Sequence, residues 1–309
     1  MTDSAATRSA GDFARHSPYT DPGSHRALVA AIAPEPRAIH RAVTATITHY
    51  RAGEAPPTPV QLADVDRRWI SSILDAAAER ADGPLDTDRA PSQRVGGCCR
   101  DHSLLAVAIL REHGVPARTR LGFASYFEPG FRHDHVVVEL RREGRWVRFD
   151  PELGDDDGFD FDFDVHEMPS GEGSPFETAA EAWLAHREGR TDLADYGVAP
   201  GHDIGGPWIV HGYVLGDLAH RMRTELLLWD GWGIMDAPRR PLTAEAIELA
   251  DRIARLTVAA DSGDDAAEES LAAIWRDDAR VRVGRTITTA SPSGRFGTTD
   301  LVERTTRWS

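Results

Sequence analysis

A helix followed directly by strands is the feature that most constrains the fold of this chain. The run that begins at Ser103 is apolar enough for a buried helix, and Gly114 followed by Pro116 ends it. Three segments with strand character come next, and a short turn at Glu143 and Gly144 joins the last two. These segments are residues 117–127, 133–142 and 145–150. A helix followed by antiparallel strands is the order of an α+β fold, so we predict that class, with the helix packed on the sheet.

The rest of the chain predicts helices on both sides of this core. Apolar residues at helical spacing predict one helix through Ile39 and Val43 and a second that begins after Thr58. Helices resume after residue 175, and an edge strand is expected within 279–289. We predict a flexible N-terminal arm, a single domain with a core and a C-terminal helical extension, and a loose tail. Their boundaries are 1–35, 36–290 (core about 93–153, extension about 175–278) and 291–309.

Charge and apolar content exclude several classes of partner. The formal net charge is −15 and the pI is near 5.3, whereas a protein that binds a phosphate backbone needs clustered Lys and Arg. We therefore expect no nucleic-acid partner. No stretch approaches the roughly 20 apolar residues that span a bilayer, so we expect no membrane partner either.

The cysteines and the first residues of the chain bear on its compartment. Cys98 and Cys99 are the two cysteines, and a bridge between chain neighbours is strained, so no disulfide framework is available. The first twenty residues include acidic residues and lack the apolar middle region of a secretory signal. We expect a cytoplasmic protein in a reducing compartment.

Cys99 is a candidate nucleophile because it falls at the start of the predicted helix. A thiol attacks an acyl carbon as the thiolate, and a helix N-terminus offers partial positive charge and unpaired N–H groups that stabilise an anion. His135 begins the second strand, and Asp150 ends the third. If these strands pair about the Glu143–Gly144 turn, the Asp150 carboxylate can orient the imidazole, which would then act as a base.

Three short motifs around these residues occur in a fixed order. They are Gly97-Cys98-Cys99-Arg100-Asp101, the strand that begins His135-Val136-Val137-Val138, and the segment Trp146-Val147-Arg148-Phe149-Asp150-Pro151. Together they resemble the transglutaminase-like core, which has a papain-like α+β fold, over residues 93–153. The resemblance implies Cys99 as nucleophile, His135 as general base and Asp150 as the orienting carboxylate.

The sequence departs from the family pattern at two positions. Val137 stands where an aromatic residue is common, and Cys98 places a second thiol beside Cys99. Segments after residue 170 are similar to the helical extensions of some bacterial transglutaminase-like proteins, a likeness that implies no activity.

Two further residues are candidates for the oxyanion or substrate site. Gln93 lies six residues before Cys99, the offset at which papain-like proteases place an oxyanion-hole glutamine, so it is a candidate donor. A glutamine in an ordinary loop is the other interpretation of that residue. Cys98 is a candidate by its position next to Cys99.

We interpret the chain as a cysteine-dependent acyltransferase, amidase or peptidase that works through a Cys99 thioester. No metal or other cofactor is required. The expected partner is a peptide or small-molecule acyl donor, and either water or an amine acceptor could resolve the thioester.

Two other interpretations stay open from the sequence. A metal-dependent hydrolase could use His133, His135 and a cysteine, since side chains two apart on a strand share a face. A catalytically inactive binding module of the same fold could use the acidic, Phe-rich loop at 154–164.

Overall fold

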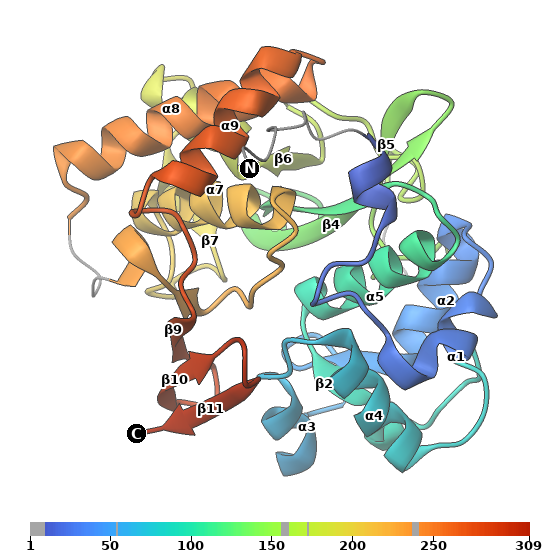
Figure 1. Ribbon diagram of the computed structural model, residues 1–309. Helices are drawn as coiled ribbons and strands as arrows, with labels where there is room; N and C mark the ends of the chain where they lie inside the picture. The colour runs from blue at the N-terminus through green and yellow to red at the C-terminus, as the bar shows by residue number, and fades with distance from the viewer. Residues whose placement is uncertain (1–9, 54, 156–160, 172, 237–240) are drawn as a thin grey trace, which may run out of the picture.

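The computed structural model describes residues 10–53, 55–155, 161–171, 173–236 and 241–309. Its centre is an antiparallel sheet with the strand order β5-β4-β3-β6, and β7 pairs in parallel with the start of β4. These strands are β3 (Ala117–Ala124), β4 (Arg132–Arg142), β5 (Arg145–Phe149), β6 (Phe176–Thr178) and β7 (Tyr196–Gly197). In Figure 1, β4 lies between helix α5 (Cys99–Glu112) and helix α7 (Pro207–Arg221). The predicted α+β class, with a cysteine-bearing helix on an antiparallel sheet, is confirmed.

The β4–β5 hairpin has the predicted turn. Glu143 (φ 49°) and Gly144 (φ 79°) both have positive φ, as the central residues of a type I′ turn require. Arg142 and Arg145 flank this two-residue loop and pair directly. A two-residue turn leaves no freedom in strand register, so it sets the positions of all later residues of β5 relative to β4.

Helix α5 is the centre of the main hydrophobic core. Its residues from Leu104 to Leu110 are all buried, in contact with apolar residues of α2, α4, β4 and β5. The Ser103 hydroxyl donates to the carbonyl of Val136 at 2.8 Å, which fixes the first turn of α5 beside the start of β4. Gly114 ends the helix with φ 70°, the left-handed conformation expected of a residue after a helix C-cap.

The N-terminal part of the chain is packed against this core rather than extended away from it. We predicted a flexible arm over 1–35; residues 1–9 lie outside the described residues, but the rest contains η1 (Ala10–Ala14), η2 (Gly23–His25) and α1 (Arg26–Ala30). Phe13, Tyr19 and Val29 are buried. Burial of these large side chains stabilises a segment that lacks helical periodicity. The prediction of a flexible arm is therefore wrong for residues 10–35.

The segments between α1 and α5 form the other side of the α5 core. They are α2 (Pro36–Thr46), β1 (Ile47–His49), α3 (Pro59–Asp64), α4 (Ile70–Arg80), η3 (Pro91–Gln93) and β2 (Val95–Gly97). Strands β1 and β2 pair in parallel, with His49 opposite Gly97. A segment that precedes Cys99 by fifty residues is therefore brought next to it.

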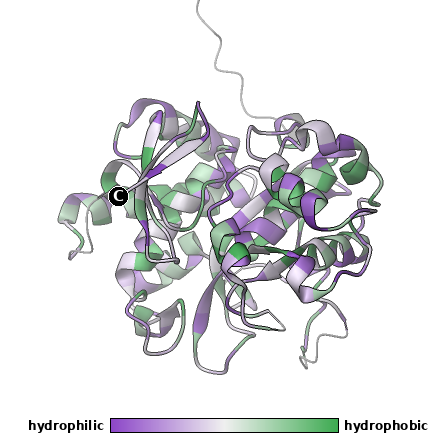
Figure 2. Cartoon of the chain, turned by 90° about the horizontal axis from the view of Figure 1, so that it is seen from below, coloured by the Kyte–Doolittle hydropathy of each residue, from purple (hydrophilic) through white to green (hydrophobic). Residues whose placement is uncertain are grey.

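The C-terminal helices pack around α7, which covers the edge of β3 that β6 leaves free. They are α6 (Ala179–Arg187), α7, α8 (Ala244–Asp261), which Thr243 caps, and α9 (Asp265–Asp277), with the short η4 (Leu193–Asp195) and η5 (Gly233–Asp236) between them. Because β6 pairs with β3 only at Gly122–Ala124, the preceding residues of β3 have a strand partner on the β4 side alone, and Asp217 of α7 accepts from the N–H of Leu121 at 2.9 Å. Figure 2 shows hydrophobic and hydrophilic residues together along most helices, as amphipathic packing requires.

A separate small sheet ends the chain. Its order is β11-β10-β9-β8, formed by β8 (Asp230–Gly231), β9 (Thr286–Ala290), β10 (Phe296–Asp300) and β11 (Thr305–Trp308). The predicted late edge strand within 279–289 is found only in part: β9 begins at Thr286, and it pairs with both β8 and β10, so it is not an edge strand. The predicted loose tail over 291–309 is wrong, because β10 and β11 pair along it.

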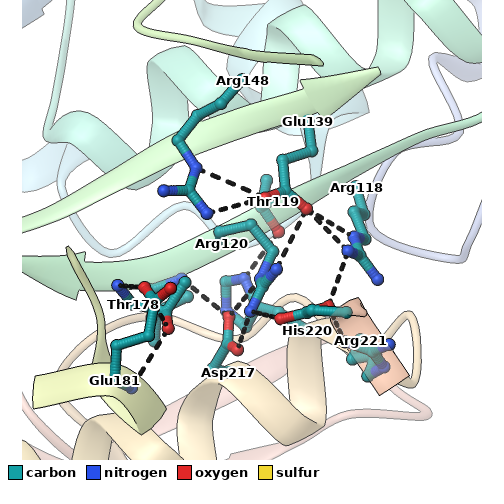
Figure 3. Close-up of polar contacts among 12 residues, drawn as sticks. Arg118, Thr119, Arg120, Glu139, Arg148, Thr178, Glu181, Asp217, His220 and Arg221 are labelled. Atoms are coloured by element: carbon teal, nitrogen blue, oxygen red, sulfur yellow. Dashed lines mark hydrogen bonds and ion pairs between the residues drawn. The ribbon is translucent and has the colours of Figure 1, made fainter. Parts of the chain in front are cut away.

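A cluster of buried charges lies on the sheet. The Glu139 carboxylate accepts from Arg118 and Arg120 through one oxygen and from Arg148 through the other, at 2.7–3.0 Å for the shortest contact of each. Asp217 and Asp261 neutralise Arg120 from the helical side, as Figure 3 shows in part. The cluster joins the sheet to α7 and α8 by ion pairs.

Candidate active site

Cys99 occupies the first position of α5, as predicted. Cys98 is the N-cap residue, and its backbone N–H donates to the Asp101 carboxylate at 2.9 Å. The residue before it must be glycine, because a Cβ at Gly97 would lie 2.9 Å from both Asp101 and Ile47. The Gly-Cys-Cys-Arg-Asp motif therefore provides a close strand-to-helix connection that presents Cys99 at the helix N-terminus.

His135 and Asp150 form a buried hydrogen-bonded pair. The Nε2 atom of His135 lies 2.7 Å from Oδ2 of Asp150. Two other donors reach the same carboxylate: the Tyr126 hydroxyl at 2.7 Å and the Glu152 backbone N–H at 2.9 Å. Burial opposes ionisation of Asp150, but His135 and the hydrogen bonds outweigh it and lower its pKa.

The environment of His135 favours its charged form. Burial disfavours the imidazolium, but the charge of Asp150 and its hydrogen bond, with Glu152 and Asp134 nearby, raise the pKa of His135 above its ordinary value. With Nε2 bonded to Asp150, Nδ1 is the ring nitrogen left to exchange a proton with another group. The arrangement is that of a base held by a carboxylate.

The thiol of Cys99 is held in its neutral form. A hydrogen bond with the Cys98 thiol, burial, and the carboxylates of Glu152 and Asp134 raise the pKa of Cys99 well above its ordinary value. Position at a helix N-terminus predicted an easily formed thiolate, and these neighbours act in the opposite direction. Ionisation of Cys99 therefore needs a base.

Cys99 and His135 line one large cavity of about 2380 Å³, together with Cys98, Asp134 and Glu152. Its walls include aromatic side chains from segments far apart in the sequence, among them Tyr50, Trp208 and Trp229. The volume exceeds the roughly 300–1,000 Å³ of a typical small-molecule site. An extended substrate can therefore be accommodated beside Cys99.

The structure does not bring Gln93 into this cavity. Gln93 is exposed in η3, and its side-chain oxygen accepts from the backbone N–H of Ala90 at 3.2 Å. The turn of η3 directs the side chain back onto its own loop before β2 begins. Gln93 therefore does not line the cavity, and its position does not support the prediction that it is an oxyanion donor, whereas Cys98 does line the cavity.

The remaining candidates have other partners. His133 lies 3.2 Å from the carbonyl of Val198, and the rings of Phe127 and Phe131 pack edge-on to it. Among the described residues, no group of three or more His, Cys, Asp or Glu side chains is arranged to hold a metal ion. The predicted metal-ligand set of His133, His135 and a cysteine thus has no support in this geometry.

The acidic, Phe-rich loop contacts the active site through Tyr126. Residues 156–160 of this loop, including Phe159, lie outside the described residues. Phe161 and Phe163 pack against Tyr126 at ring-centroid distances of 5.8 and 5.5 Å. Sequence reasoning missed Tyr126, since a tyrosine at the end of a strand carries no signal of its role.

The charged pair predicts a pH-dependent contribution to stability. The raised pKa of His135 stabilises the fold below the ordinary value of 6.5, and this contribution is lost as the pH rises through the folded pKa. The lowered pKa of Asp150 stabilises the fold above its ordinary value of 3.8, and this contribution is lost as the pH falls through the folded pKa. Both groups are charged between these limits.

Asp150→Asn should therefore reduce the free energy of unfolding more at about pH 5.5 than at about pH 9, by on the order of 1 kcal/mol. Urea unfolding at the two pH values measures this difference. The control is Asp162→Asn, which removes an exposed carboxylate and should show no such difference. An equal cost of Asp150→Asn at both pH values would contradict the charged pair.

In the described part of the chain, no helix combines the length and the apolar character needed to cross a membrane.

Comparison with known proteins gives one family and one structure. The family model of the transglutaminase-like superfamily matches residues 45–151, a range that includes Cys99, His135 and Asp150. No curated protein matches the chain. A solved structure described as a "Putative Cysteine Protease from Cytophaga hutchinsonii" is 22% identical, over 46% of this chain and 41% of that one, with a TM-score of 0.30. The chain thus spans less than half of that protein.

Proposed function

We propose that this chain, of which residues 45–151 match the family model of the transglutaminase-like superfamily, is a cysteine-dependent acyltransferase or amide hydrolase with Cys99 as its nucleophile. The observation that carries the proposal is the His135–Asp150 hydrogen bond at the wall of the cavity that Cys99 also lines. A neutral thiol and a carboxylate-oriented imidazole are the two groups from which a base-activated nucleophile is made.

The proposed reaction starts from the neutral form of His135, which forms as the pH rises through its raised pKa, and begins with proton transfer from the Cys99 thiol to Nδ1 of His135. The thiolate then attacks the carbonyl carbon of the acyl donor and forms a tetrahedral oxyanion. When this collapses, the carbon–nitrogen bond breaks, and the imidazolium gives its proton to the leaving amine. The product of this half is a Cys99 thioester, with His135 neutral again.

In the second half, water or an amine attacks the thioester while His135 removes its proton. Collapse breaks the carbon–sulfur bond, and the sulfur regains the proton from His135. Water gives hydrolysis, and an amine gives acyl transfer. The cavity volume supports a peptide or other extended acyl donor as substrate.

The test is the capture of the acyl-enzyme. Incubation with p-nitrophenyl acetate should add one acetyl group to Cys99, visible by peptide mass spectrometry and removed by hydroxylamine. His135→Ala should slow this acetylation by about 10²–10⁴-fold, the usual contribution of a general base. Acetylation that is absent from Cys99, or unchanged in His135→Ala, would contradict the proposal.

The composition of the chain simplifies the search for an acceptor. The sequence contains no lysine, so all 35 basic residues counted as Lys and Arg are arginines. A labelled primary amine offered with a glutamine-containing peptide therefore has no ε-amine of the enzyme itself to compete with. Label in the peptide indicates acyl transfer, and loss of the amide without label indicates hydrolysis.

A further inference from the structure

A tetrahedral oxyanion beside Cys99 needs hydrogen-bond donors, and Gln93 does not supply one. The first N–H groups of a helix have no intrahelical acceptor, which makes the backbone N–H of Cys99 one natural donor. A second donor has to come from another wall of the cavity. Several polar groups there already have acceptors: the Tyr213 hydroxyl bonds to Asp134, and the Trp229 and Trp232 indoles bond to Asp66 and to the Val281 carbonyl.

His49 is another polar side chain of this cavity, and its place in the fold is close to Cys99. It ends β1 directly opposite Gly97 of β2, two residues before Cys99, and it lines the same cavity. The following residue, Tyr50, donates its backbone N–H to the Gly97 carbonyl at 2.9 Å, which ties the end of β1 to the approach to Cys99. The Tyr50 ring stacks on the His49 ring at 5.4 Å with an interplanar angle of 19° and so fixes its plane.

The hydrogen bonds of His49 define its tautomer. Its Nδ1 atom accepts from the backbone N–H groups of Arg51 and Ala52, both at 3.2 Å. A nitrogen that accepts has no proton, so the proton of the neutral ring is on Nε2. Burial lowers the pKa of His49 and so favours this neutral form.

We propose that the Nε2–H of His49, with the backbone N–H of Cys99, forms the oxyanion hole of this enzyme. The inference rests on the proposed function and adds a catalytic residue to it. The hydrogen bond strengthens as the carbonyl oxygen gains negative charge in the tetrahedral intermediate, which is how such donors lower the barrier. A neutral imidazole donates this hydrogen bond and does not compete with His135 for the proton of the Cys99 thiol.

Substitution of His49 by each of the two amide residues tests its two ring nitrogens separately. His49→Asn places a carboxamide oxygen near the position of Nδ1, where it can still accept from Arg51 and Ala52, and removes the donor at Nε2. His49→Gln places its amide near the position of Nε2 and restores a donor there. The first variant therefore preserves the turn and loses the oxyanion contact, and the second tests for rescue.

Two reactions of Cys99 separate an oxyanion role from a general loss of reactivity. Acetylation by p-nitrophenyl acetate passes through a tetrahedral oxyanion, whereas alkylation by iodoacetamide is a displacement at saturated carbon and forms none. His49→Asn should slow acetylation by about 10²-fold or more and change alkylation by less than about twofold. His49→Gln should be acetylated at least tenfold faster than His49→Asn.

The outcomes are distinct. Equal slowing of both reactions in His49→Asn, or unchanged rates in both, would overturn the role of His49. If wild-type Cys99 is acetylated at a rate that depends on His135 but not on His49, the donor role falls and the proposed function stands. If wild-type Cys99 reacts with neither reagent, the proposed function itself fails. Circular dichroism of each variant checks that the fold is retained.

Discussion

Replacing Cys99 with alanine is expected to lower the turnover of p-nitrophenyl acetate by about 10⁴-fold or more, since the loss of a nucleophile removes the whole covalent route. Steady-state release of p-nitrophenol measures the loss, and intact mass should show no acetyl adduct. A variant that keeps more than about a tenth of the activity would show that another group is acylated.

Cys98→Ala is the matched control, because it removes an adjacent buried thiol from the same cavity. The hydrogen bond that the Cys99 thiol donates to Cys98 is the largest cause of the raised pKa of Cys99, so its removal should lower that pKa. At a fixed neutral pH, alkylation of Cys99 should then be as fast as in wild type or faster. Loss of acetylation in Cys98→Ala with retention in Cys99→Ala would assign the nucleophile to Cys98 instead.

The second large effect is expected on stability. Glu139→Gln removes the charge that Arg118, Arg120 and Arg148 share, and it leaves these buried guanidinium groups without one of their counter-ions. Breaking a buried pair from one side typically costs about 3–5 kcal/mol, so the free energy of unfolding should fall by that amount. Urea unfolding at neutral pH measures it.

Glu167→Gln serves as the control for this substitution. Glu167 also pairs with two arginines, Arg142 and Arg145, but on the exposed side of the hairpin. Surface ion pairs contribute about 0–1 kcal/mol, so this variant should be nearly as stable as wild type. If the free energy of unfolding falls equally in the two variants, burial does not make the Glu139 ion pairs more stabilising than those at the surface.

The difference between wild type and Glu139→Gln should also depend on pH. The arginines hold the pKa of Glu139 well below its ordinary value of 4.5, against the effect of burial. A lowered pKa stabilises the fold above the ordinary value, and this contribution is lost as the pH falls through the folded pKa. The cost of the substitution should therefore be constant near neutrality and decrease in acid below about pH 4.5.

Local sequence was sufficient for the core elements of this protein. The apolar run after Ser103 and the stop at Gly114 and Pro116 predicted α5, and the Glu143–Gly144 pair predicted the hairpin. These features depend on side-chain periodicity and on backbone conformations that few residues adopt, so they can be recognised without tertiary context. Once the hairpin register was set, proximity of His135 to Asp150 followed from it.

Local sequence failed where long-range packing decides the outcome. Residues 10–35 and the last strands have little periodicity, and their order comes from burial of Phe13, Tyr19 and Val29 and from pairing of β10 with β11. Gln93 was predicted to be an oxyanion donor from its offset to Cys99. An offset along the chain does not fix the direction of a side chain in an irregular turn.

The sequence by itself determined the helix start that carries Cys99, the hairpin that joins His135 to Asp150, and the α+β class. Only the tertiary structure decided which other groups meet them: His49 through the parallel pairing of β1 with β2, Tyr126 through its hydroxyl on Asp150, and Glu152 through its charge on the thiol. The physical reason is the distance along the chain over which the interactions act. Turns and caps are formed by neighbours in the chain, whereas the electrostatics of a buried thiol depend on every charge that folding brings near it.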